Sequence, residues 1–107
     1  MKTSAPQLSF TQAIRAALHD AMALDSEVFV YGIAVDAKVA IFGTTQGLVE
    51  RFGRGRVLDT PISEQALTAL AVGAANTGLR PVLVHQRVDF MLYSMDQIVN
   101  WMAAWRF

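Results

Sequence analysis

Cysteine is absent from the 107-residue chain. Its absence excludes a disulfide framework, a thiolate metal site and a cysteine nucleophile. A chain without cysteine also fits an intracellular protein, because disulfides are rare inside most cells.

Charged residues are few as well. They make up 17% of the sequence, against about 25% in ordinary soluble domains. Nine basic residues balance nine acidic residues, so the formal net charge is zero. Proteins that bind nucleic acids or membrane surfaces normally carry a basic face. We therefore expect neither a nucleic acid nor a membrane as a partner.

Long hydrophobic runs are also missing. The longest, residues 66–75, is broken by Thr68 and has about half the roughly 20 residues that a membrane span needs. Residues 1–10 contain one lysine and no apolar stretch, so they are not expected to act as a secretory signal.

Apolar residues, by contrast, make up 53% of the sequence. A chain of this length holds one domain at most, and it is near the lower limit for burying a core unaided. The apolar excess predicts either a buried partner interface or a domain that has been cut short. The bulky side chains near the last residue favour the same two explanations: Trp101, Met102, Trp105 and Phe107.

Hydrophobic spacing predicts alternating helices and strands. Ser9 and Gln12 form a capping-box pattern in front of a helix over 10–24. Further helices are predicted over 45–52, 64–77 and 89–107, the last with an apolar side made of Met91, Met95, Ile98, Val99, Met102 and Trp105. Short, continuously apolar runs predict strands covered on both faces over 28–31, 57–58 and 81–85. This alternation is typical of an α/β fold with a parallel sheet flanked by helices.

The most informative segment is Asp59-Thr60-Pro61-Ile62-Ser63-Glu64. Ser63 is a suitable N-cap, and Glu64 falls in the first turn of a helix that follows a strand. α/β folds keep their ligand sites at this edge of the sheet. Periodicity alone favours a simpler role, in which Glu64 only complements the helix dipole. Small residues fill the rest of this helix and predict close packing against a sheet or a second subunit.

The remaining polar candidates favour structural roles. Residues 53–56, Gly-Arg-Gly-Arg, lack phosphate-loop spacing and predict a turn. His19 and His85 are too far apart in the sequence to suggest a metal site. Asp96 and Asn100 share a helix face that is either functional or simply polar. Ser63 has no recognisable histidine and acid partners, so a catalytic triad is unsupported.

Several segments together resemble the N-terminal part of the transketolase-like pyrimidine-binding domain. The similarity is greatest to the beta subunit of the first component of 2-oxo acid dehydrogenase complexes. It runs from about Phe10 to the last residue and rests on Val28–Gly32, Thr45–Leu48, Phe52-Gly53, Arg56–Glu64, Gly73–Ala75, Gly78–Val82, Asp89-Phe90 and Met95–Asn100. The resemblance implies that residues 1–107 form an incomplete domain, a truncated thiamine diphosphate-binding fold.

The resemblance implies thiamine diphosphate as cofactor and oxidative decarboxylation of a 2-oxo acid as the reaction. Glu64 matches the family's glutamate, which hydrogen-bonds a pyrimidine nitrogen and promotes removal of the thiazolium proton. Ile62, Arg87 and Phe90 are implied as further cofactor contacts. The implied partners are an alpha subunit that holds the diphosphate and Mg²⁺, a second beta chain, and a lipoyl acyltransferase that receives the acyl group. No metal ligand is expected in this chain. The implied location is the bacterial cytoplasm or the mitochondrial matrix.

Three features depart from the family pattern, and the first is that the resemblance stops inside the pyrimidine-binding domain. Ile33 and Ala34 follow Gly32 where the family usually has acidic residues, so an acidic link between paired active sites is not expected. Val84 and Arg87 replace a glutamate and an aromatic residue, which predicts altered cofactor packing. Two alternatives therefore stay open: another transketolase-like enzyme, such as a carbon–carbon transferase, and a non-catalytic remnant that acts as an interaction module.

Overall fold

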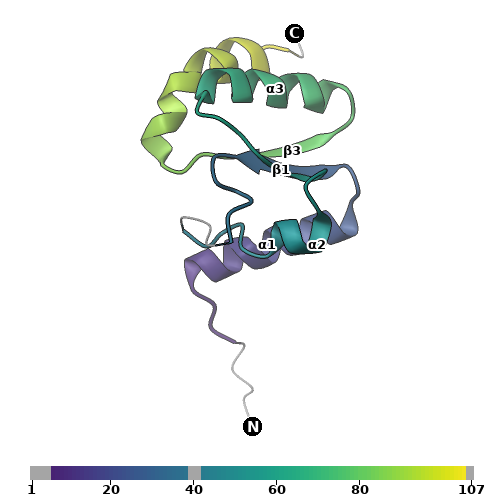
Figure 1. Cartoon of the computed structure of the whole chain (residues 1–107). Helices are drawn as coiled ribbons and strands as arrows, with labels where there is room; N and C mark the ends of the chain where they lie inside the picture. The colour runs from purple at the N-terminus through teal and green to yellow at the C-terminus, as the bar shows by residue number, and fades with distance from the viewer. Residues whose placement is uncertain (1–5, 39–41, 106–107) are drawn as a thin grey trace.

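The computed structural model describes residues 6–38 and 42–105. It has a three-stranded sheet between two helical layers (Figure 1). The elements in chain order are α1 (Phe10–Leu24), β1 (Val28–Gly32), α2 (Leu48–Phe52), β2 (Val57–Asp59), α3 (Glu64–Asn76), β3 (Arg80–Val84), the 3₁₀ helix η1 (Val88–Ser94) and the π helix η2 (Gln97–Met102). The predicted α/β class is confirmed.

The sheet has the order β2-β1-β3, and both strand pairs are parallel. α1 and α2 cover one face, and α3 with η1 and η2 covers the other (Figure 1). β1 therefore lies at the centre with both faces covered, which explains its continuous apolar sequence. Within residues 6–38 and 42–105, no helix is long and apolar enough to cross a membrane.

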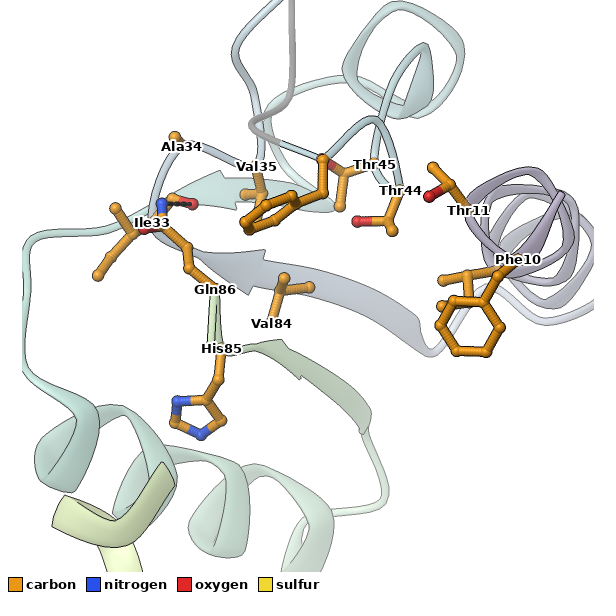
Figure 2. Close-up of a pocket in the computed structure, with 12 residues that line it drawn as sticks. Phe10, Thr11, Ile33, Ala34, Val35, Thr44, Thr45, Val84, His85 and Gln86 are labelled. Atoms are coloured by element: carbon orange, nitrogen blue, oxygen red, sulfur yellow. Dashed lines mark hydrogen bonds between the residues drawn. The ribbon is translucent and has the colours of Figure 1, made fainter. Parts of the chain in front are cut away.

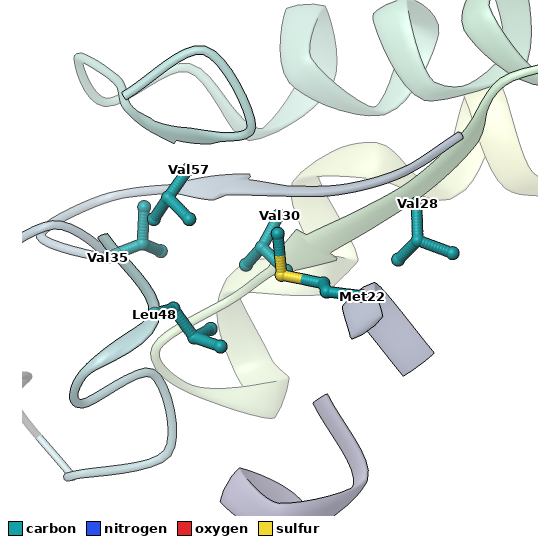
Figure 3. Packing of buried hydrophobic residues seen from close by; sticks show 6 residues of the cluster. All are labelled: Met22, Val28, Val30, Val35, Leu48 and Val57. Atoms are coloured by element: carbon teal, nitrogen blue, oxygen red, sulfur yellow. The ribbon is translucent and has the colours of Figure 1, made fainter. Parts of the chain in front are cut away.

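The best-packed core lies between the sheet and the α1–α2 layer. It is a cluster of buried residues (Figure 3): Met22, Val28, Val30, Val35, Leu48 and Val57. The predicted capping box at the start of α1 is confirmed, because Ser9 and Gln12 exchange side-chain and backbone hydrogen bonds. Phe10, at the first position of the helix, stays 83% exposed.

Helix α3 begins at Glu64 as expected, but Ser63 makes no side-chain capping hydrogen bond. Thr68 and Ala71 on one side of α3 are buried, and α3 packs against β3, η1 and η2. Of its small residues, Ala71 packs within the chain, whereas Ala66, Ala69, Gly73 and Ala75 are exposed. The expected end at Gly78 is borne out by a φ of +96° there.

The prediction of one α-helix over 89–107 is wrong for the described residues. The segment forms η1 and η2 instead, and Phe107 lies outside the described part. The predicted apolar side is largely exposed, with Val99, Met102 and Trp105 each more than half exposed, whereas Ser94 and Gln97 are buried. The physical reason is the number of residues per turn. A 3₁₀ turn and a π turn do not have the 3.6 residues of an α-helical turn, so α-helical spacing predicts the wrong set of side chains to be buried.

Candidate functional site

A pocket of about 380 Å³ lies where the three parallel strands end. Ile33 follows β1, Ile62 and Glu64 follow β2, and the remaining wall follows β3. Its lining residues are Ile33, Ile62, Glu64, Gln86, Phe90 and Tyr93. Ligand sites of open α/β sheets form at this edge, because successive loops converge there.

Glu64 is the one acidic residue in this lining. As the first residue of α3, it lies at the positive end of the helix dipole, which favours a negative charge. Its backbone carbonyl accepts a hydrogen bond from Thr68 Oγ1 at 2.8 Å. Among the described residues, no hydrogen bond or ion pair engages its carboxylate. The carboxylate is therefore available to a ligand.

The loops after β1 and β3 approach closely beside the pocket. Gly32 has a φ of +149°, and a Cβ at this position would lie 2.5 Å from the backbone oxygen of Val84. Just beyond, Gln86 Nε2 donates a hydrogen bond to the Ile33 carbonyl at 3.3 Å. Only glycine permits this approach, which brings Ile33 and Gln86 into one wall.

The sheet is also fastened to the helix that carries Glu64. The Tyr31 hydroxyl, at the end of β1, donates a hydrogen bond to the backbone carbonyl of Leu67 in α3. Tyr31 is only 1% exposed. This burial raises the pKa of Tyr31 to about 12, against a smaller lowering by the Ala71 backbone. The hydroxyl therefore remains a neutral donor throughout the physiological pH range.

Of the four site residues predicted from the sequence, the structure brings three into this pocket: Glu64, Ile62 and Phe90. Arg87 is absent from the lining. Its side chain is 65% exposed, pairs with Asp89 at 3.2 Å, and lies over the Phe90 ring at 5.6 Å from the centroid. Arg87 therefore contacts Phe90 without lining the pocket itself.

Sequence reasoning missed three residues of the pocket. Ile33 was noted only as a departure from an acidic pattern, and Gln86 and Tyr93 were not proposed as site residues. The positions of Ile33 and Gln86 carried a usable signal, because every residue just beyond a parallel strand is a candidate for this edge. Tyr93 lies in η1 and carried no such signal. Val84, which stands where a family glutamate was expected, lines a different pocket.

That second pocket, of about 430 Å³, lies between α1, the loop after β1 and the end of β3 (Figure 2). It shares Ile33 and Gln86 with the Glu64 pocket, and Phe10 and Phe42 add exposed aromatic rings to its border. His85 is among its lining residues, although its ring points towards the α3 layer in the view of Figure 2.

The weaker polar candidates take structural roles. Residues 53–56 form a turn, in which the Arg56 N–H donates to the Gly53 carbonyl at 3.2 Å. Asp96 accepts hydrogen bonds from Asn100 at 2.8 Å and from Gln97 at 3.0 Å, which accounts for this polar group. Within the ranges that the structure describes, no three histidine or acidic residues gather in a way that could hold a metal ion.

The parallel sheet and the pocket at its carboxyl edge define the class of this protein as an α/β domain with a pocket that contains a carboxylate. The model of the family "Transketolase, pyrimidine binding domain" matches residues 6–107. The chain belongs to this family, as its sequence resemblance implied.

Three curated relatives illustrate the similarity. The chain is 44% identical over 94 residues to the pyruvate dehydrogenase E1 component subunit beta of Rickettsia bellii, covering 88% of this chain and 29% of the relative. It is 40% identical over 100 residues to the 2-oxoisovalerate dehydrogenase subunit beta of Bacillus subtilis, covering 94% and 31%. It is 41% identical over 99 residues to the 3-methyl-2-oxobutanoate dehydrogenase subunit beta of Mycobacterium tuberculosis H37Rv, covering 92% and 28%. The chain thus spans less than a third of the length of these relatives.

Proposed function

We propose that this chain binds the aminopyrimidine end of thiamine diphosphate within a 2-oxo acid dehydrogenase, as a beta-subunit segment of the first component. The observation that carries the proposal is the position of Glu64, an unpaired carboxylate among the described residues, in a pocket whose other lining residues are apolar or aromatic except for Gln86. The similarity to three beta subunits of such dehydrogenases supports it.

The residues of the pocket fit a flat aminopyrimidine ring in their chemistry. Phe90 and Tyr93 offer aromatic surface, and Ile33 and Ile62 offer apolar surface. Glu64 offers an acceptor that can hold a proton on a ring nitrogen, and Gln86 offers a neutral amide. Thus the ring would be bound by apolar contact and oriented by one carboxylate, the combination that small-molecule sites commonly use.

In this proposal the bound cofactor supplies the carbon nucleophile and the electron sink that decarboxylation of a 2-oxo acid requires. Glu64 would accept a hydrogen bond from the pyrimidine nitrogen and so hold a proton at that atom. Ile33, Ile62 and Phe90 would supply apolar contact surface for the ring.

The proposal includes partners, because the names of the relatives describe them as beta subunits. An alpha subunit would bind Mg²⁺ and the diphosphate, a second beta chain would complete the assembly, and a lipoyl acyltransferase would accept the acyl group. Residues 1–107 would then form part of a longer pyrimidine-binding domain. Such an assembly would work in a bacterial cytoplasm or in a mitochondrial matrix; the name of a relative from Pisum sativum includes the word mitochondrial.

The decisive experiment replaces Glu64 with glutamine in the chain assembled with an alpha subunit. General acid–base catalysis contributes about 10²–10⁴-fold to rate, so Glu64→Gln should lower decarboxylation of 2-oxo acids by at least about 100-fold. The same variant should bind thiamine diphosphate more weakly in isothermal titration calorimetry, since a charge-assisted hydrogen bond is lost.

Glu50→Gln is the matched control. Glu50 is also an acid in the first turn of a helix, α2, but its side chain is exposed and lies outside the pocket. It should leave both turnover and cofactor affinity unchanged. Near-normal turnover of Glu64→Gln would overturn the proposed function.

A further inference from the structure

The first turn of α3 lacks the usual side-chain cap. Ser63 occupies the N-cap position without a capping hydrogen bond, and the turn is closed by the backbone bond from the Leu67 N–H to the Ser63 carbonyl at 2.9 Å. Glu64 belongs to this turn, and no described residue holds its carboxylate. The direction of Glu64 therefore depends on how firmly the backbone of the turn is held.

Two hydroxyl groups hold that backbone. Thr68 Oγ1 donates to the Glu64 carbonyl at 2.8 Å, a bond within the helix itself. The Tyr31 hydroxyl donates to the Leu67 carbonyl, a bond from the sheet to the helix. Both side chains are buried, Tyr31 at 1% and Thr68 at 3% exposure. Among the hydrogen bonds of the described residues, the bond from Tyr31 is the one that connects residues 64–68 to the sheet, and it adds a directional contact to the packing of α3 on β3.

Tyr31 also sets the opposite wall of the pocket. It pairs with Leu58 and Leu83 at the centre of the sheet, and its ring stacks on Phe29 with centroids 5.4 Å apart. Two residues later the same strand end delivers Ile33 to the pocket. One residue thus fixes the strand that leads to Ile33 and, through its hydroxyl, the helical turn that carries Glu64.

We propose that Tyr31 is a positioning residue for Glu64: its hydroxyl fixes the first turn of α3 against β1 and thereby aims the carboxylate into the pocket. This inference rests on the proposed function, because it assigns Tyr31 to the reaction of Glu64. It predicts that the hydroxyl affects ligand binding only through Glu64.

The first test needs no ligand. Tyr31→Phe removes the hydroxyl and keeps the ring. Hydrogen exchange of the chain should then be about tenfold faster at the Leu67 and Thr68 amides, since a buried hydrogen bond of this kind is worth roughly one such factor. The Ala13 amide, which bonds to the Ser9 carbonyl in α1, serves as the internal reference and should not change. Unchanged exchange at Leu67 and Thr68 would overturn the proposal.

The second test is a double-mutant cycle on thiamine diphosphate affinity in the chain assembled with an alpha subunit. Tyr31→Phe should weaken binding about fivefold to tenfold when Glu64 is present, and by less than about twofold in the Glu64→Gln background. An equal loss in both backgrounds would mean a general structural role and would overturn the inference alone. If Glu64→Gln itself binds and turns over normally, the proposed function and the inference both fall.

Thr68→Val provides a matched variant that removes the other hydroxyl of this turn while the sheet-to-helix bond remains. Its cofactor affinity should stay within about twofold of the unmodified chain, because the turn is still anchored to β1. If Thr68→Val reproduced the full loss seen with Tyr31→Phe, packing of the turn in general would explain the effect, and the specific role of Tyr31 would be rejected.

Discussion

The Asp59 carboxylate, at the end of β2, accepts a hydrogen bond from the backbone N–H of Ala34 in the loop after β1. Ala34 has a φ of +57°, the one positive value among the described non-glycine residues. Next to it, the Thr60 N–H donates to the Gly32 carbonyl at 3.1 Å. Asp59, the first residue of the Asp-Thr-Pro-Ile-Ser-Glu segment, therefore has a structural role: it stabilises the conformation of the loop after β1.

Asp59→Ala should lower the free energy of unfolding by about 1 kcal/mol, because the Ala34 N–H loses its acceptor while the loop keeps its left-handed conformation. Asp59→Asn retains an acceptor oxygen and is the matched control. It should lose less than half as much. Urea unfolding followed by circular dichroism measures both variants. Equal losses would show that the charge, not the hydrogen bond, carries the effect.

Gly32→Ala should lower the free energy of unfolding by more than about 3 kcal/mol, since its Cβ would lie 2.5 Å from the Val84 oxygen and φ is +149°. Gly53→Ala is the matched control. Gly53 also has a positive φ, +78°, but nothing lies within 4 Å of its added Cβ. It should lose only about 1 kcal/mol. Comparable thermal stability of the two variants would contradict close approach of β1 and β3.

Arg56→Lys should lower the free energy of unfolding by about 2 kcal/mol. The guanidinium donates to the backbone carbonyls of Met22, Asp25 and Val28 at 2.7–3.0 Å, and a lysine cannot satisfy three such acceptors with the same planar geometry. The control is Arg54→Lys, whose side chain is 78% exposed and pairs with Asp36. There the loss should stay below about 0.5 kcal/mol. Guanidinium chloride midpoints would distinguish the two.

Stability should fall in alkaline solution through Tyr31. An exposed tyrosine of the unfolded chain ionises near pH 10, whereas burial raises the pKa of Tyr31 to about 12 in the folded chain. Between these values the folded state retains a proton that the unfolded state has lost. The free energy of unfolding therefore decreases as pH rises, by up to about 1.4 kcal/mol per pH unit. Below about pH 10 the group has no effect on the pH dependence.

This alkaline decrease is measured as the difference between the intact chain and Tyr31→Phe, in thermal unfolding from pH 9 to pH 12. The difference cancels the other groups that titrate in the same range. Tyr31→Phe should show a flatter profile between pH 10 and pH 12. Parallel profiles would show that Tyr31 ionises as readily in the folded chain as in the unfolded one.

The sequence by itself determined the order of the helices and strands from α1 to the end of β3 at Val84, and with it the parallel α/β class. It also determined that Glu64 lies at the start of a helix that follows a strand. These features depend on local periodicity, capping patterns and glycine positions, all of which involve residues that are close together in the sequence. Even so, the short helix predicted from residue 45 begins only at Leu48, because helix ends depend on single hydrogen bonds.

Only the tertiary structure decided how the pocket is walled and how its helix is held. Ile33 and Gln86 come from the loops after β1 and β3, and Tyr93 joins them from η1. The bond from Tyr31 to Leu67 spans 36 residues of sequence. The sequence likewise did not predict the 3₁₀ and π turns of η1 and η2, where the segment packs on α3. Apart from the positions of Ile33 and Gln86 directly after strands, each of these features depends on contacts between residues far apart in the chain, which no local pattern of side chains predicts.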